Sequence, residues 1–85
     1  MKITVIKDKR ELSEYRPGEV GKPFADDEWY IVCPQCRIVA GLGNHQVAEH
    51  DDGTLSFLPA IVCPYADHGL CSAHYFIGRN LVRWC

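Results

Sequence analysis

Residues 28–42 read EWYIVCPQCRIVAGL, and this stretch decides the fold. Apolar runs rich in aromatic and β-branched residues flank Cys33-Pro34-Gln35-Cys36, which is typical of two strands joined by a turn. Two cysteines separated by two residues can sit on one tight turn, where backbone N–H groups donate to the first thiolate. The stretch therefore predicts a hairpin whose turn is a zinc knuckle, with Cys33 and Cys36 as metal ligands.

A structural zinc ion takes four ligands in a tetrahedron, so a second pair must come from elsewhere in the chain. The downstream candidates are Cys63, His68, Cys71, His74 and Cys85. Cys71 and His74 repeat the two-residue gap of the first pair and lead into another predicted hairpin. We therefore expect one Zn²⁺ held by Cys33, Cys36, Cys71 and His74. Cys63 and His68 remain alternatives to the second pair, and Cys85 is interpreted as a bystander.

The segments before the knuckle carry weaker signals. Residues 2–7 alternate apolar and polar side chains and predict a short strand. Residues 8–16 are polar and are expected to form a helical turn. Residues 17–27 contain two Pro, two Gly and three acids, and they are expected to form a loop.

The segments after the knuckle predict more strands. Residues 54–58 and 60–63 are two short apolar runs, and Pro59 is expected to interrupt the strand between them. Residues 74–77 and 81–84 predict a hairpin around a turn at residues 78–80. The predicted fold class is small and mostly β, with zinc-ribbon-like antiparallel hairpins stapled by one zinc ion.

The chain has 85 residues, which is enough for one domain with a small core. A domain of this size buries only about 60–65 % of the surface that its unfolded chain exposes. Such domains often need a metal, a disulfide or a partner for stability. We expect one zinc-binding domain over residues 1–85, in which residues 27–85 form the metal-stapled core and residues 1–26 contribute a strand and a loop.

Charge and targeting signals narrow the classes of function. Nine Lys and Arg side chains face eleven Asp and Glu, for a net charge of -2, which disfavours non-specific nucleic-acid binding. The first apolar run stops at Ile6, well short of a signal peptide, and no stretch approaches the ~20 apolar residues of a membrane span. Five cysteines without an export signal predict thiols or metal ligands. We expect a cytoplasmic location, in a bacterial cell or a phage-infected host.

Signs of catalysis are weak in this sequence. A catalytic zinc keeps one position open and needs a general base nearby, and Glu49 is the single glutamate between the two ligand pairs. Neither H-E-x-x-H nor the H-x-E of the zinc deaminases occurs. We expect no catalysis, with a small zinc-dependent hydrolase as an alternative. His45 and His50 are expected to be solvated loop residues and not a second metal site.

The last third of the chain contains three short motifs. They are Thr54-Leu55 with Pro59-Ala60-Ile61, Cys71-Ser72-Ala73-His74-Tyr75-Phe76-Ile77, and Val82-Arg83-Trp84. Residues 28–85 resemble a family of small bacterial and phage proteins that are zinc-ribbon-like and carry T-L-x-P-S-I, C-x-x-H-[FY]-x-I and V-x-W. The chain departs from the family at Phe57 and Leu58, which lengthen the link to Pro59, and at Ala60, where the family has Ser. The resemblance implies Cys71 and His74 as ligands.

The most favoured function is a zinc-stabilised binding or adaptor module for a protein partner. The predicted contact residues are Trp29, Tyr30, Tyr65, Arg79 and Arg83, with Tyr75 and Trp84 as further aromatic candidates. A nucleic-acid-binding zinc ribbon is the second hypothesis, in which Arg37 joins the two arginines in a small basic patch. No membrane association is expected. The identity of the partner and the oligomeric state stay open, since a strand at residues 81–85 could pair with a second chain.

Overall fold

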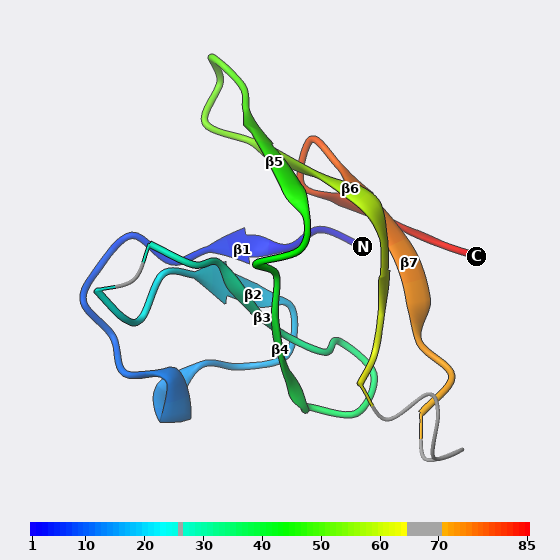
Figure 1. Ribbon diagram of the computed structural model, residues 1–85, viewed down its shortest axis with the longest axis horizontal. Helices are drawn as coiled ribbons and strands as arrows, with labels where there is room; N and C mark the ends of the chain where they lie inside the picture. Colours follow the sequence, from blue (N-terminus) through cyan, green and yellow to red (C-terminus); the bar gives the residue numbers. More distant parts are fainter. Residues whose placement is uncertain (26, 65–70) are drawn as a thin grey trace.

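The computed structural model describes residues 1–25, 27–64 and 71–85, and its strands form two four-stranded sheets (Figure 1). The first sheet contains β1 (Thr4–Val5), β2 (Glu19–Gly21), β3 (Tyr30–Val32) and β4 (Val39–Gly41), in that order. The second contains β5 (Gln46–Glu49), β6 (Leu55–Val62), β7 (His74–Gly78) and β8 (Leu81–Trp84), in that order. A single 3-10 turn, η1 (Leu12–Glu14), follows β1. The predicted mostly-β class with antiparallel hairpins is confirmed.

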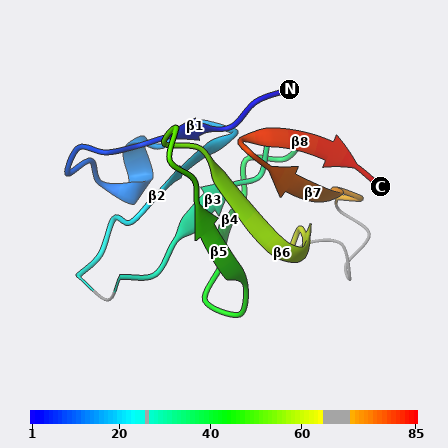
Figure 2. The same ribbon diagram turned by 90° about the horizontal axis from the view of Figure 1, so that it is seen from above.

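Neighbouring strands pair antiparallel, except β1 and β2, which are parallel. The N-terminal residues also run beside β8, where Lys2 bridges Leu81 (Figure 2). This bridge and the hydrogen bond from the Val82 N–H to the Met1 carbonyl, 2.8 Å long, link the start of the chain to the second sheet. Within the described ranges, no helix is long and apolar enough to cross a membrane.

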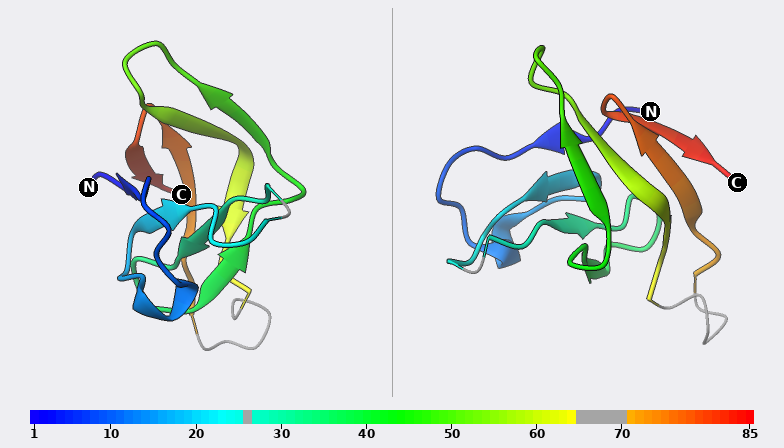
Figure 3. Two further views of the ribbon diagram at one scale, coloured as in Figure 1. Left: turned by 90° about the vertical axis from the view of Figure 1, so that its left-hand side faces the viewer. Right: turned by 45° about the horizontal axis from the view of Figure 1, so that its top comes forward.

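The two sheets share one core, because alternate side chains of each strand point to the same face. Figure 3 shows the strands β1 to β4 on one side and β5 to β8 on the other. Val20 and Ile31 come from the first sheet, Phe57 and Tyr75 come from the second, and all four are at most 1 % exposed. The Trp29 ring packs edge-on against the Phe57 ring, with centroids 6.3 Å apart. Burial of each such large side chain stabilises the fold by roughly 1.5–3 kcal/mol.

Three details differ from the sequence-based expectations. Residues 17–27 were expected to form a loop, yet they contain β2, whose Val20 pairs with Ile31 of β3. The strand β5 was not expected at all. Pro59 does not end its strand, because β6 runs from Leu55 to Val62 with a bulge between Phe57 and Ile61. Proline is tolerated at such a bulge, where its missing N–H leaves no ladder position unpaired.

The β7–β8 hairpin was expected, and Asn80 fixes its turn. Arg79 and Asn80 have φ values of 47° and 67°, and a two-residue type I′ turn requires positive φ at both positions. The Asn80 side-chain oxygen accepts a 2.7 Å hydrogen bond from the Leu55 N–H, and the Asn80 carbonyl accepts one of 2.8 Å from the Ile3 N–H. Asn80 therefore joins three segments of the chain: the β7–β8 turn, β6 and the N-terminal strand.

Replacement of Asn80 separates the two contributions of its side chain. Asn80→Ala should lower the free energy of unfolding by roughly 2–4 kcal/mol, because it loses the bond to Leu55 and strains a left-handed backbone. Asn80→Gly loses the same bond but adopts positive φ freely, so it should cost only about 1–2 kcal/mol. Urea unfolding of the metal-loaded protein measures both. Equal losses in the two variants would contradict a role for the left-handed backbone.

Candidate metal centre

Four cysteine thiols come together at one end of the two sheets. The Sγ atoms of Cys33, Cys36, Cys63 and Cys71 all lie within 4.8 Å of one another. Cys36 and Cys63 are 3.4 Å apart at sulfur, and Cys33 and Cys71 are 3.9 Å apart. Sulfurs bound at 2.3 Å to a tetrahedral zinc ion would be about 3.8 Å from each other. The four thiols are therefore spaced as ligands of one metal ion.

The four thiols come from segments of both sheets. Cys33 and Cys36 lie in the turn between β3 and β4, whereas Cys63 follows β6 and Cys71 precedes β7. Figure 1 shows the β3–β4 turn beside the end of β6 and the start of β7. The Cys63 N–H donates to the Ala73 carbonyl at 3.0 Å, which keeps these two segments side by side. A metal ion at this position would link the first sheet to the second.

Backbone hydrogen bonds and a positive φ fix the turn between β3 and β4 and orient its two cysteine side chains. The Cys33 N–H donates to the Ile38 carbonyl at 2.7 Å, and the Arg37 N–H donates to the Cys33 carbonyl at 3.1 Å. Arg37 has a φ of 69°, which turns the backbone back toward β4. The backbone N–H groups of Gln35 and Cys36 donate to the Cys33 sulfur, and that of Ile38 donates to the Cys36 sulfur. These are the N–H···S bonds that the C-P-Q-C sequence predicts.

The electrostatics of the group favour a bound cation. Burial raises the pKa of the Cys33 thiol above its ordinary value. Burial also acts to raise the pKa of Cys36, but the Ile38 N–H and the three neighbouring thiols outweigh it, so that pKa is lowered. Burial and then the four nearby cysteines raise the pKa of the Tyr75 phenol well above its usual range. Four thiolates this close repel one another, and a dication between them removes most of that cost.

The second pair of ligands differs from the expectation in one member. Cys33, Cys36 and Cys71 lie together as predicted, but the fourth thiol belongs to Cys63, which takes the place predicted for His74. His74 is exposed between the buried residues Ala73 and Tyr75, because successive residues of a strand point to opposite faces. Cys71 and His74 are three residues apart in extended chain, so their side chains diverge. The same spacing in the β3–β4 turn brings Cys33 and Cys36 together.

The remaining ligand candidates that the structure describes are not part of the thiol group. Cys85 is exposed after β8, and His68 falls outside the described residues. The His45 Nε2 lies 3.3 Å from the Ala60 carbonyl, and the His50 Nε2 lies 2.7 Å from the Ser56 hydroxyl. In the part of the chain that the structure describes, the four cysteines form the only group suited to hold a metal ion.

The predicted contact residues that the structure describes are divided between the two sheets. Trp29 and Tyr30 are half-buried at the first sheet, where Lys22 lies 4.8 Å above the Trp29 ring. Arg79 and Arg83 are exposed on the second sheet, and Arg79 lies 3.8 Å from the Asp52 carboxylate. The two further aromatic candidates separate as well, since Tyr75 is in the core and Trp84 is half-exposed. Tyr65 is outside the described residues.

Comparisons with protein-family models, with curated proteins and with solved structures found no match. The fold and the thiol group therefore carry the functional argument. The resemblance to small bacterial and phage proteins stays a prediction based on the three sequence motifs.

Single substitutions can test the choice of ligands. Cys63→Ser should weaken metal binding by more than about 100-fold, because loss of an outer-shell partner alone costs roughly 10- to 100-fold. His74→Ala and Cys85→Ser should leave the affinity unchanged. Competition with a chromophoric chelator measures the affinity, and the thiolate-to-metal absorption of the Co²⁺-loaded protein should diminish only in the Cys63 variant. Loss of metal from His74→Ala, with Cys63→Ser unaffected, would restore the Cys3His site.

Proposed function

We propose that this protein is a small zinc-stabilised module that binds a protein partner and has no catalysis of its own. The observation that carries the proposal is the group of four thiols at ligand spacing, with members from both sheets. Tetrahedral sets of four sulfurs are used by zinc and by iron. Zinc is favoured here because paired cysteines on a tight turn are typical of structural zinc sites.

A structural role for the metal is supported by the ligand set. Four cysteines fill every position of a tetrahedral ion, whereas a catalytic zinc keeps one position for water or substrate. Three of the four thiols are buried, and Cys36 is half-buried. Among the described residues, the group includes no carboxylate or imidazole that could act as a general base beside the ion.

The size of the domain supports the same role. The core is small, and several of its residues are the metal-binding thiols themselves: Cys33, Cys63 and Cys71 belong to the buried cluster. Binding of a structural zinc ion contributes on the order of 10 kcal/mol at neutral pH, and that energy becomes folding energy when the site is absent from the unfolded chain. A domain of this size has an unaided stability of only a few kcal/mol.

A role in protein binding is supported by the apolar surface of the molecule. Large hydrophobic side chains that are exposed include Phe24, Leu58, Val62, Phe76, Leu81 and Trp84. Single exposed hydrophobic residues are normal on soluble domains, but contiguous ones mark interaction surfaces. Most of these residues belong to β6, β7 and β8, so the second sheet is the best candidate for a surface that meets another protein.

Removal of the metal tests its structural role. The purified protein should carry one zinc ion per chain in native mass spectrometry, and treatment with a chelator should abolish its cooperative unfolding transition and the dispersion of its amide NMR signals. Return of Zn²⁺ should restore both. Cys85→Ser is the matched control, because it removes a thiol outside the group and should behave as the unmodified chain does.

Three results would contradict the proposal. A metal-free chain with a dispersed spectrum would show that the thiols are not a structural site. Iron in the freshly purified protein, with the visible absorption of an iron–thiolate centre, would replace zinc by a redox metal. Disulfides between the four cysteines under reducing conditions would exclude a metal centre altogether.

A further inference from the structure

The second sheet has one face in the core and one face that no other described element covers. On β7, the buried residues Tyr75 and Ile77 alternate with the exposed Phe76. On β6, the buried Phe57 is followed by the exposed Leu58, and the buried Ile61 is followed by the exposed Val62. We call the side away from the core the outer face. It presents Leu58, Val62, Phe76 and Leu81, which are 58 %, 51 %, 46 % and 39 % exposed.

The strand register places these apolar residues next to one another. Tyr75 lies opposite Ile61 and Ile77 lies opposite Phe57, so Phe76 faces the bulge at residues 58–60 between them. Leu58 enters this bulge directly after Phe57, and it is exposed as Phe76 is. Leu58 and Phe76 therefore lie on the outer face of two adjacent strands.

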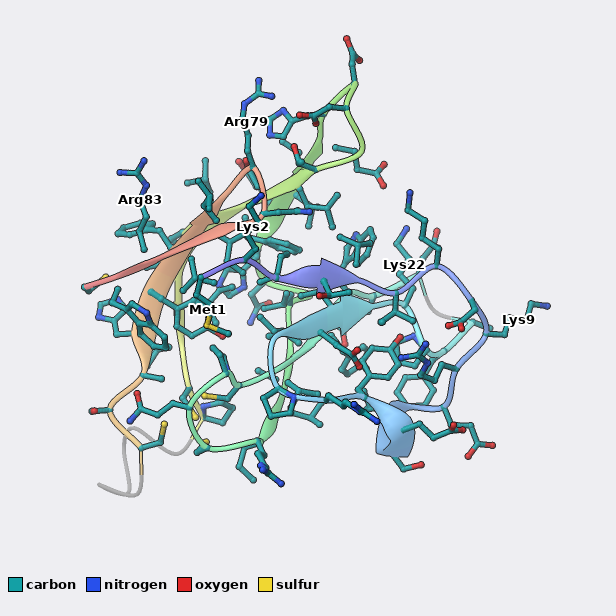
Figure 4. The ribbon with its side chains drawn as sticks, turned by 180° about the vertical axis from the view of Figure 1, so that it is seen from behind. Met1, Lys2, Lys9, Lys22, Arg79 and Arg83 are labelled. Atoms are coloured by element: carbon teal, nitrogen blue, oxygen red, sulfur yellow. The ribbon has the colours of Figure 1, made fainter. Side chains whose placement is uncertain are left out.

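Cations border this apolar centre. Arg83 pairs directly with Phe76 across the β7–β8 ladder, and Lys2 pairs with Leu81 at the bridge to the N-terminal segment. Among the described residues, neither Arg83 nor Lys2 has an ion-pair partner. Figure 4 shows Lys2, Arg79 and Arg83 around β8, with Lys9 and Lys22 at the other end of the molecule.

The strands β6, β7 and β8 lack the acidic side chains that give the whole protein its negative charge. β6, β7 and β8 contain no Asp or Glu, although the full chain has eleven acids and a net charge of -2. Acids beside these strands include Glu49 of β5, which pairs with Leu55, and Asp52 of the β5–β6 turn, which lies 3.8 Å from Arg79. The outer face is therefore apolar at its centre and positive along β8, and its complement is a surface that is apolar and negative.

We infer that the outer face of β6, β7 and β8 is the docking surface of the module and that it takes a segment of a partner protein in which apolar side chains alternate with acidic ones. This inference rests on the proposed protein-binding function and specifies its surface and the chemistry of its partner. Leu58, Val62 and Phe76 would contact the apolar side chains, and Arg83 and Lys2 would pair with the acids.

A protein segment fits this surface better than a single-stranded nucleic acid does. Bases stack on aromatic rings, and among Leu58, Val62, Phe76 and Leu81 the outer face has Phe76 as its single aromatic side chain. Two unpaired cations would neutralise few phosphates, so binding to a nucleic acid would be weak at physiological salt. Leu58 and Val62 instead supply the aliphatic contact area that is typical of the centre of a protein interface.

The metal centre supports this surface from one end. Val62 directly precedes the ligand Cys63, and Val62 pairs with His74, three residues after the ligand Cys71. The β6–β7 end of the outer face is thus anchored by the thiol group. The test must therefore use the zinc-loaded chain, and each variant must first be shown to carry one zinc ion.

The experiment is to pan a library of random 16-residue displayed peptides over the immobilised zinc-loaded protein. Enriched peptides should combine Asp or Glu with Leu, Ile, Val or Phe. The best of them, as a labelled synthetic peptide, should bind at least about tenfold more weakly to Phe76→Ala and to Arg83→Glu, as expected for central contact residues. Its affinity should also fall with added salt.

Two control variants match these substitutions on the other side of the molecule. Phe24→Ala removes an exposed phenylalanine from the connection between β2 and β3, and Lys9→Glu reverses the charge of an exposed lysine at the end of the molecule away from β8. Both should bind the peptide as the unmodified protein does. Equal effects of the control and test variants would overturn the assignment of the surface.

Other outcomes separate this inference from the function on which it rests. Peptides that bind equally well to Phe76→Ala and Arg83→Glu would leave a protein-binding module with a different surface, and the inference would fail. If the folded, zinc-loaded protein enriches no peptides that are both acidic and apolar, the inference about the docking surface also fails. The structural role of zinc would be unaffected by that result. Binding of a 20-nucleotide single-stranded DNA that is lost in Arg83→Glu would make the outer face a nucleic-acid interface instead.

Discussion

The contact between the two sheets at the thiol group is the constraint on which the rest of the structure depends. The first sheet is made of short strands, since β1, β2, β3 and β4 have two or three residues each. Strands this short bury little surface by themselves and are stable only when another layer covers them. A metal ion bound by Cys33 and Cys36 from one sheet and by Cys63 and Cys71 from the other would hold the layers in a fixed register.

Local signals in the sequence predicted the parts of the fold that are themselves local. The Cys33–Cys36 turn and the β7–β8 hairpin each lie within a short stretch whose spacing or turn residues specify the geometry. The strand β2 was not predicted, because Val20 is the only apolar side chain of this strand and turn-rich segments flank it. The position of β2 depends on the pairing of Val20 with Ile31. The strand β5 likewise depends on its partner β6, since exposed residues make up most of it.

The fourth ligand shows what a spacing rule can and cannot specify. Equal gaps in Cys33–Cys36 and Cys71–His74 suggested equal roles, but a gap of two residues brings side chains together in a turn and separates them in a strand. Prediction of Cys63 required knowledge that β6 ends beside the start of β7. The sequence did show an apolar run at residues 60–63 that ends at Cys63. That run was the available signal that the Cys63 thiol is buried.

The thiol group also has an optical consequence. Tyr75 is buried against the four cysteines, and its ring meets the Trp84 ring edge-on with centroids 5.4 Å apart. A change of charge at the sulfurs thus acts on a phenol that touches an indole, and Trp84 is half-exposed at the edge of the sheet. If a metal ion binds to the four thiols, the emission of Trp84 would therefore report its loading and release without an added label.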